Sequence, residues 1–284
     1  MVRQLLLLLR GQKSEVVIVS AAPRHIFEEI LVGGGSDGDC TFRQSTMDAG
    51  GVKQLNPFDV DVEGTRGRVE AALLERENIV QREAEWIAAE GVDGVVVDVA
   101  FFPIQAATRA NVPSVIVSNF TWDSIYAPFV SAEALARITA DYACASLIVR
   151  LPGWIDIPCS ATVPMVTAPL LVRSTMASRA AVRERFDLPL DARVVLIQFG
   201  GHEYKLSWGS LKLPEGWFGL VCGPASSLDP AALPAFMRHV PESTYLPDVC
   251  AAVDVKIVQQ YHIKIFLFRR SWSASWVTGR APRR

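Results

Sequence analysis

The residues with the best spacing for chemistry follow two short β-branched runs, Val95–Val99 and Ser114–Ser118. A carboxylate at such a position can act as a base or accept hydrogen bonds from sugar hydroxyls. An indole stacks well on the apolar side of a sugar ring, and an amide can bind its hydroxyl groups. We therefore predict Asp98 and Asp123 as catalytic candidates, and Asn119 and Trp122 as substrate-binding candidates.

Each of these residues also has a structural interpretation. Asp98 can cap the amides of the helix that follows it, and caps are commoner than catalytic acids. Asp123 or Thr121 can cap the next helix while Trp122 fills the core. The sequence leaves both interpretations open.

A second group follows the apolar run Arg193–Phe199. Gly200 and Gly201 let the backbone approach a ligand closely because no Cβ intrudes, although a tight turn explains them equally well. His202 can contact a phosphate or act as a base, or it can be an exposed loop residue. Gly223 follows another short run and is expected to line the far side of the same cleft. These four residues complete the predicted substrate-binding set.

The elements around these residues predict an α/β fold. The runs at Val95–Val99 and Ser114–Ser118 flank an alanine-rich connection of about fifteen residues, which is typical of a βαβ unit and hence of a parallel sheet. Ligands of open α/β sheets bind beyond the carboxyl ends of the strands, where the candidates lie. Other expected strands are Val16–Ser20, Thr41–Thr46, Ser146–Arg150 and Gly219–Cys222, and expected helices are Arg66–Glu90, Ser131–Ala145, Ser178–Phe186 and Pro230–Arg238.

Two stretches interrupt this pattern. Four prolines between Pro152 and Pro169 predict an extended linker, because no long helix tolerates that spacing. From Lys256 the sequence becomes basic and rich in Trp and Ser, without alternating strands and helices. We therefore expect a first lobe over residues 1–165, a partial second lobe over residues 166–255 and a divergent basic tail over residues 256–284.

Composition excludes several classes of function. A formal net charge of −2 and a pI near 6.1 give no electrostatic footprint for nucleic acid. The run Leu5–Leu9 is too short for a membrane span. The five cysteines have no zinc or disulfide spacing, which favours a reducing, cytoplasmic compartment. We expect no metal, no cofactor, no nucleic-acid partner and no membrane partner.

The chain resembles the N-terminal region of plant-type L-arabinokinase, which is similar to glycosyltransferases with two Rossmann-like lobes (GT-B). The matching segments are VVIVSAAPRHIF, DGVVVDVAFFPIQAA, VPSVIVSNFTWDSIY, DYACASLIVRLPG, VVLIQFGGH, LPEGWFGLVCG and YLPDVCAAVD. The resemblance implies a role in sugar metabolism. It also implies a sugar or nucleotide-sugar bound between Asn119–Asp123 and Gly200–Gly201.

Three departures from the family pattern qualify this expectation. The family's first strand with its Gly/His-rich loop, its Gly-rich turn after the segment that ends at Asp254, and its sugar kinase domain have no counterpart here. We therefore expect a GT-B fold without the first strand and with an incomplete second lobe. Binding without turnover is favoured, and the kinase domain is expected elsewhere in a full-length protein. A non-catalytic regulatory or interaction domain, or a truncated gene product without activity, remains the alternative.

Overall fold

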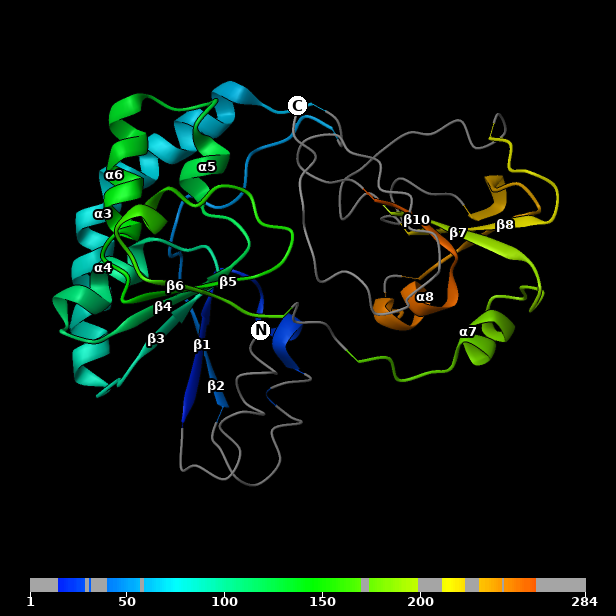
Figure 1. Ribbon diagram of the computed structural model, residues 1–284, viewed down its shortest axis with the longest axis horizontal. Helices are drawn as coiled ribbons and strands as arrows, with labels where there is room; N and C mark the ends of the chain where they lie inside the picture. The colour runs from blue at the N-terminus through cyan, green and yellow to red at the C-terminus, as the bar shows by residue number, and fades with distance from the viewer. Residues whose placement is uncertain are drawn as a thin grey trace. The chain divides into compact units, whose positions relative to one another are not determined.

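The computed structural model describes residues 15–28, 31, 40–56, 59–169, 174–198, 211–222, 230–241 and 243–258. The chain divides into two compact units. Unit 1 comprises residues 1–53 and 60–172, and unit 2 comprises residues 54–59 and 173–284. Both are α/β, and every strand pair among the described residues is parallel (Figure 1). The expected fold class is confirmed.

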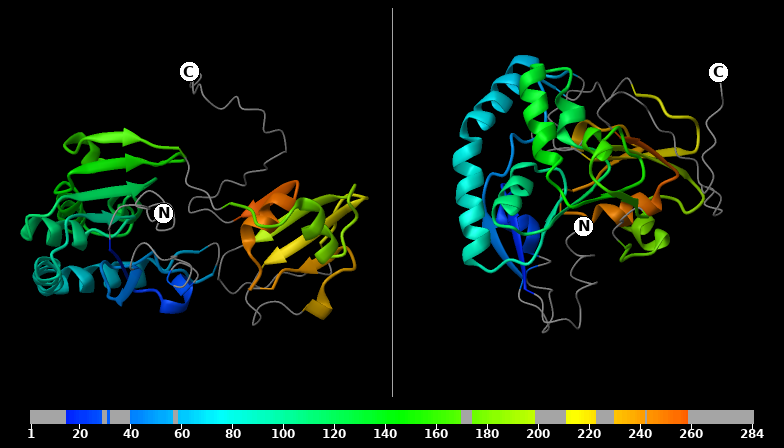
Figure 2. Two further views of the ribbon diagram at one scale, coloured as in Figure 1. Left: turned by 90° about the horizontal axis from the view of Figure 1, so that it is seen from below. Right: turned by 60° about the vertical axis from the view of Figure 1, so that its left-hand side comes forward.

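Unit 1 contains two separate parallel sheets. Strands β1 and β2 form the smaller one, and the larger has the strand order β3-β4-β5-β6. Helices α3, α4 and α6 pack against one another beside the larger sheet (Figures 1 and 2). The elements are β1 (Val16–Ser20), η1 (Arg24–Phe27), β2 (Cys40–Gln44), α3 (Val62–Ala89), β3 (Val95–Val97), α4 (Phe102–Arg109), β4 (Ser114–Ser118), α5 (Trp122–Tyr126), α6 (Ala132–Tyr142), β5 (Leu147–Arg150), η2 (Pro158–Ala161) and β6 (Met165–Thr167).

The predicted βαβ unit is present as β3-α4-β4. Ile116 of β4 and Ile104 of α4 are both fully buried in the core that joins this sheet to the helices. Helix α3 begins four residues before the expected start because Asp61 caps it, with its carboxylate accepting a hydrogen bond from Gly64 N at 2.8 Å. The strands β3 and β4 are thus present where the sequence pattern predicts them, and the candidate residues Asp98 and Asn119 directly follow their carboxyl ends.

Unit 2 has one parallel sheet with the strand order β10-β7-β8-β9. Its central strand β7 is buried on both faces: Val194 and Leu196 pack with the helices, whereas Val195 and Ile197 pack on the opposite face. Such two-sided burial explains the uninterrupted apolar run in the sequence. The elements are α7 (Arg179–Arg185), β7 (Arg193–Gln198), β8 (Trp217–Cys222), η4 (Pro230–Ala232), β9 (Met237–His239), α8 (Leu246–Ala252) and β10 (Val255–Val258).

Three expectations about local structure are wrong. The proline-rich stretch is not wholly a linker, because η2 and the edge strand β6 lie within it and β6 pairs with β5. The expected helix Pro230–Arg238 is only the short turn η4, after which Met237 already belongs to β9. Residues Lys256–Val258 are not part of a tail, since β10 pairs with β7. Edge strands of three or four residues are too short for a two-residue period to reveal them.

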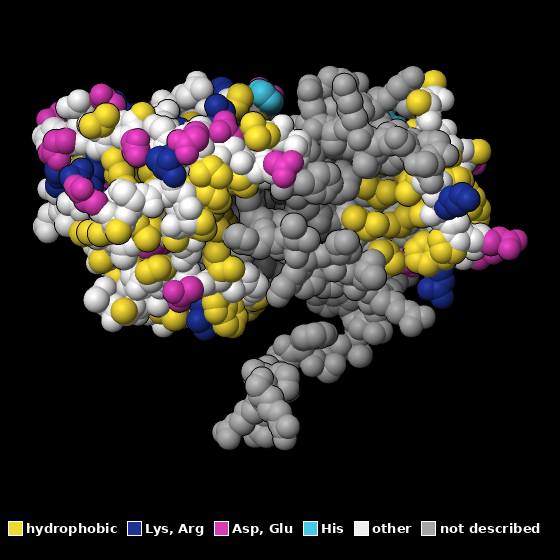
Figure 3. Space-filling model, turned by 90° about the horizontal axis from the view of Figure 1, so that it is seen from above, with side chains coloured by type: hydrophobic (Ala, Val, Ile, Leu, Met, Phe, Trp, Pro, Cys, Tyr) yellow, Lys and Arg dark blue, Asp and Glu magenta, His cyan; other side chains and the backbone are white. Residues whose placement is uncertain are grey.

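Surface charge is mixed rather than concentrated. In the face seen in Figure 3, acidic and basic side chains are interspersed over unit 1. Ion pairs on the helices of unit 1 include Arg109–Glu77 at 2.6 Å and Arg137–Glu133 at 2.8 Å. The visible face therefore offers no field of a single sign to a polyanion.

A buried arginine holds the α7–β7 connection of unit 2 to α8. Arg183 is fully buried, and its guanidinium donates hydrogen bonds to four backbone carbonyls and to Asp254 Oδ2 at 3.0 Å. Asp254 also accepts from Val194 N at 2.9 Å and from Arg179 at 2.8 Å. The carbonyls belong to Pro189, Leu190, Ala192 and Ala252.

These contacts predict an acid-dependent loss of stability in unit 2. Burial alone would raise the pKa of Asp254, but the bonds from Val194 and Arg179 and the two arginine charges outweigh burial and lower it. A carboxyl with a lowered pKa stabilises the fold above its unfolded pKa of about 3.9, and that contribution is lost as the pH falls through the folded pKa. We expect the free energy of unfolding to fall below about pH 4, and to fall less in Asp254→Asn. Urea denaturation across that range tests this, and equal acid slopes for both proteins would contradict it.

Candidate functional site

Polar residues gather at the carboxyl ends of three neighbouring strands of unit 1. Asp98 follows β3, Asn119 follows β4, and the loop Leu151–Asp156 follows β5. The loop is attached to β4, because Leu151 N donates to Ser118 O at 2.9 Å and Ile155 N donates to Asn119 O at 3.0 Å. We call Asp98, Ser118, Asn119 and residues 150–156 the carboxyl edge.

Asp98 is solvent-exposed at this edge. Desolvation by the surrounding protein raises the pKa of its carboxyl group, and the Ser118 side chain partly offsets this rise. Helix α4 is preceded by Phe101 and has no side-chain cap. The helix-capping role is therefore not observed, and the carboxylate is available to a ligand.

Trp122 and Asp123 lie in the core of unit 1. Trp122 is only 9% exposed, stacks on Tyr126 and donates its indole N–H to Asp48 Oδ2 at 2.9 Å. Asp123 is 1% exposed and accepts hydrogen bonds from Thr121 Oγ1 at 2.5 Å, Thr139 Oγ1 at 2.9 Å and Ser124 N at 3.0 Å. The geometry favours the structural interpretation of both residues.

Trp154 is the aromatic residue that the structure exposes at the carboxyl edge. It is 49% exposed, and the Arg150 guanidinium lies over its ring, 3.9 Å from the centroid. The sequence analysis missed it because residues 152–169 were interpreted as a linker. The signal was the Gly153–Trp154 pair shortly after the strand that ends at Arg150: Gly153 has a φ of +78°, which favours glycine and turns the chain there.

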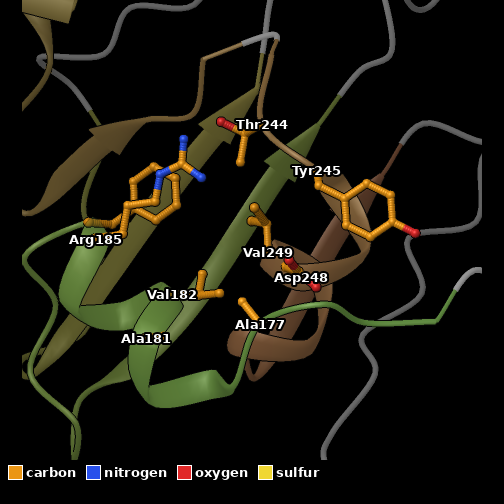
Figure 4. Close-up of a pocket in the computed structure, with 9 residues that line it drawn as sticks. Ala177, Ala181, Val182, Arg185, Thr244, Tyr245, Asp248 and Val249 are labelled. Atoms are coloured by element: carbon orange, nitrogen blue, oxygen red, sulfur yellow. The ribbon is translucent and has the colours of Figure 1, made fainter. Parts of the chain in front are cut away.

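The predicted residues of unit 2 cannot be placed, since Gly200, Gly201, His202 and Gly223 lie outside the described residues. The described part of unit 2 has a pocket of about 210 Å³ between α7 and α8 (Figure 4). Its lining is mostly apolar side chains with Arg185, Thr244, Tyr245 and Asp248 among them.

The polar groups of that pocket are largely engaged by the protein. Asp248 Oδ1 accepts from Met176 N at 2.6 Å, and Tyr245 OH donates to Ser174 O at 3.0 Å. Thr244 Oγ1 is inaccessible to solvent and makes no hydrogen bond. The pocket is therefore suited to a small apolar group more than to a sugar with many hydroxyls.

Two further observations concern the described residues only. Within them, no group of three or more His, Cys, Asp or Glu side chains has the geometry to hold a metal ion. In the same ranges, the helices are too short or too polar to cross a membrane.

The sequence is similar to a known plant enzyme. Over 247 residues it is 32% identical to L-arabinokinase of Arabidopsis thaliana, and the match covers 84% of this chain. Most of the chain thus resembles one part of an L-arabinokinase. The resemblance expected from the motifs is confirmed. The chain spans only 23% of the length of that relative, and no family model matches the sequence.

Two solved structures share the fold. Both are of UGT89C1 from Arabidopsis thaliana, one in complex with quercetin and one with UDP. The first has a TM-score of 0.54 at 13% identity and the second 0.53 at 12%; each match covers 90% of this chain and 69% or 70% of that protein. The fold is therefore α/β of the GT-B glycosyltransferase type.

Proposed function

We propose that this protein acts in sugar metabolism by binding a sugar or nucleotide-sugar at the carboxyl edge of unit 1. The observation that carries the proposal is the 32% identity to L-arabinokinase over 84% of the chain. The GT-B fold supports it, since a protein of this fold holds UDP.

The chemistry of the edge suits a polyhydroxy ligand. The exposed Asp98 carboxylate can accept hydrogen bonds from sugar hydroxyls, and the half-buried Asn119 amide can donate and accept them. If glycosyl transfer occurs, the raised pKa of Asp98 makes it a better base toward an acceptor hydroxyl than an ordinary carboxylate.

Replacing Asp98 by Asn should weaken ligand binding without unfolding the protein. We expect calorimetric titration to detect binding of UDP-glucose, UDP or L-arabinose by the wild type. A tenfold or larger loss is expected in Asp98→Asn, because hydrogen bonds to a charged group contribute about 1.5–3 kcal/mol.

The matched control is Asp93→Asn. Asp93 is exposed at the opposite end of β3, before the strand begins, and it should bind as the wild type does. No binding of any of the three compounds by folded wild-type protein would overturn the proposal. Equal losses of affinity in both variants would show that Asp98 has no specific role in ligand binding.

A second candidate function is a non-catalytic interaction or regulatory domain on a GT-B scaffold. The burial of Trp122 and Asp123 favours it, since one predicted substrate-binding residue and one predicted catalytic residue lie in the core. Folded wild-type protein that binds none of the three compounds is the result this candidate predicts.

A further inference from the structure

The carboxyl edge carries Arg150 beside its exposed tryptophan, and this arginine has no carboxylate partner among the described residues. Arg150 Nη2 donates to Thr167 Oγ1 at 3.3 Å, and its buried Nε makes no hydrogen bond. Within the described residues Arg150 forms no ion pair, whereas the partly buried Arg76 of the same unit pairs with Asp141. The Arg150 guanidinium therefore places a positive charge at the carboxyl edge, and not all of its N–H donors are used in hydrogen bonds within the described residues.

The surface next to this charge is apolar and held in place. Arg150 covers one face of the Trp154 indole, and the residue is nevertheless 49% exposed. Backbone bonds from Leu151 to Ser118 and from Ile155 to Asn119 fix the loop on both sides of Trp154. Ser124 Oγ donates to Asp156 O and fixes its far end.

Stacking on the indole does not occupy the N–H donors of Arg150. The N–H donors of a guanidinium point outward in its own plane, so Arg150 can stack on Trp154 and still donate to an anion at its rim. A ligand that matches both groups has a ring with an apolar C–H face and an attached negative charge.

We propose that Trp154 and Arg150 bind a sugar that carries a phosphate, as in a nucleotide-sugar. The sugar ring stacks on the open face of Trp154, and the phosphate pairs with Arg150. This inference rests on the proposed function and deepens it, because it assigns the ligand's charge and the two side chains that select it. Asp98 and Asn119, on the neighbouring strand ends, then face the sugar hydroxyls.

Titration of single variants tests the inference. For UDP-glucose, Trp154→Ala should weaken binding about tenfold or more, as expected for loss of an aromatic anchor. Arg150→Gln should weaken it by a similar factor and reduce its dependence on salt. Binding of uncharged L-arabinose should respond to Trp154→Ala but not to Arg150→Gln. Leu74→Ala and Arg137→Gln change an exposed apolar and an exposed basic residue on helices of the same unit and should leave binding unchanged.

Fluorescence separates stacking from a general structural effect. UDP-glucose should change the tryptophan emission of the wild type, whereas Trp154→Phe should keep part of the affinity and lose most of that change. If the wild type binds and both Trp154→Ala and Arg150→Gln bind equally well, this inference is overturned and the proposed function stands. A wild type that binds none of the compounds overturns both.

Discussion

Replacing Arg183 by Met should destabilise unit 2 by about 3–5 kcal/mol, a large part of the stability of a typical domain. Arg183 is fully buried and satisfies four backbone carbonyls as well as Asp254. Methionine fills a similar volume but donates no hydrogen bond, so these acceptors would be buried without partners. Lysine cannot restore them, because it lacks the planar fork of donors.

Arg185→Met is the matched control for this prediction. It lies two residues away on the same helix, is exposed and contacts Phe186 through its guanidinium at 5.8 Å from the ring centroid. We expect it to change the free energy of unfolding by less than about 1 kcal/mol. Chemical denaturation, monitored by hydrogen exchange of the β7 and β8 amides, measures the free energy of unfolding of unit 2 in both variants. Equal effects of the two substitutions would refute the role assigned to Arg183.

Replacing Asp123 by Ala should destabilise unit 1 by about 3 kcal/mol, since one buried donor and two half-buried donors lose their acceptor. Two of them are threonine hydroxyls, Thr121 at the start of α5 and Thr139 in α6, so the carboxylate ties these helices together. Asp123→Asn keeps one acceptor oxygen and should cost less. Thermal unfolding monitored in β4 and α6 by hydrogen exchange gives the measurement.

Glu133→Ala is the matched control for Asp123→Ala, because it removes a carboxylate from the equivalent position of another helix. Glu133 stands at the second residue of α6, as Asp123 does in α5, but its side chain is exposed and forms an ion pair with the exposed Arg137. We expect a change of about 0.5 kcal/mol or less. If Asp123→Ala retains full stability and loses ligand binding, the catalytic interpretation of Asp123 regains support and the structural one is wrong.

Strands and helices with a clear period were predictable from the sequence. Strand β4 matches its expected bounds because its apolar run is bounded by polar residues, and β7 matches its expected run from Arg193 to Gln198, with Phe199 outside the described residues. The misassigned elements are short and held by tertiary pairing. Strand β6 exists because β5 pairs with it, and its three exposed residues show no apolar period.

The sequence predicts which edge of the sheet carries the candidate site, but it does not predict which side chains at that edge are exposed. Parallel pairing places Asp98 and Asn119 at one edge, as the strand pattern predicts. Which tryptophan faces solvent depends on contacts from distant residues: Asp48 binds the Trp122 indole across 74 positions of sequence. No local pattern contains that information, so Trp122 was predicted as the stacking residue.

The strand order of unit 2 has a consequence for the way this protein folds. Strand β7 lies between β10 and β8, yet β10 is the last described strand to be synthesised, some 60 residues after the Val194 amide that Asp254 binds. Until it arrives, β7 is a bare edge with unpaired backbone groups on one side. Closing so long a loop is slow, and the nascent chain is prone to aggregation in that interval. The strand with the longest buried run in the described part of the unit is therefore also the one that waits longest for its neighbour.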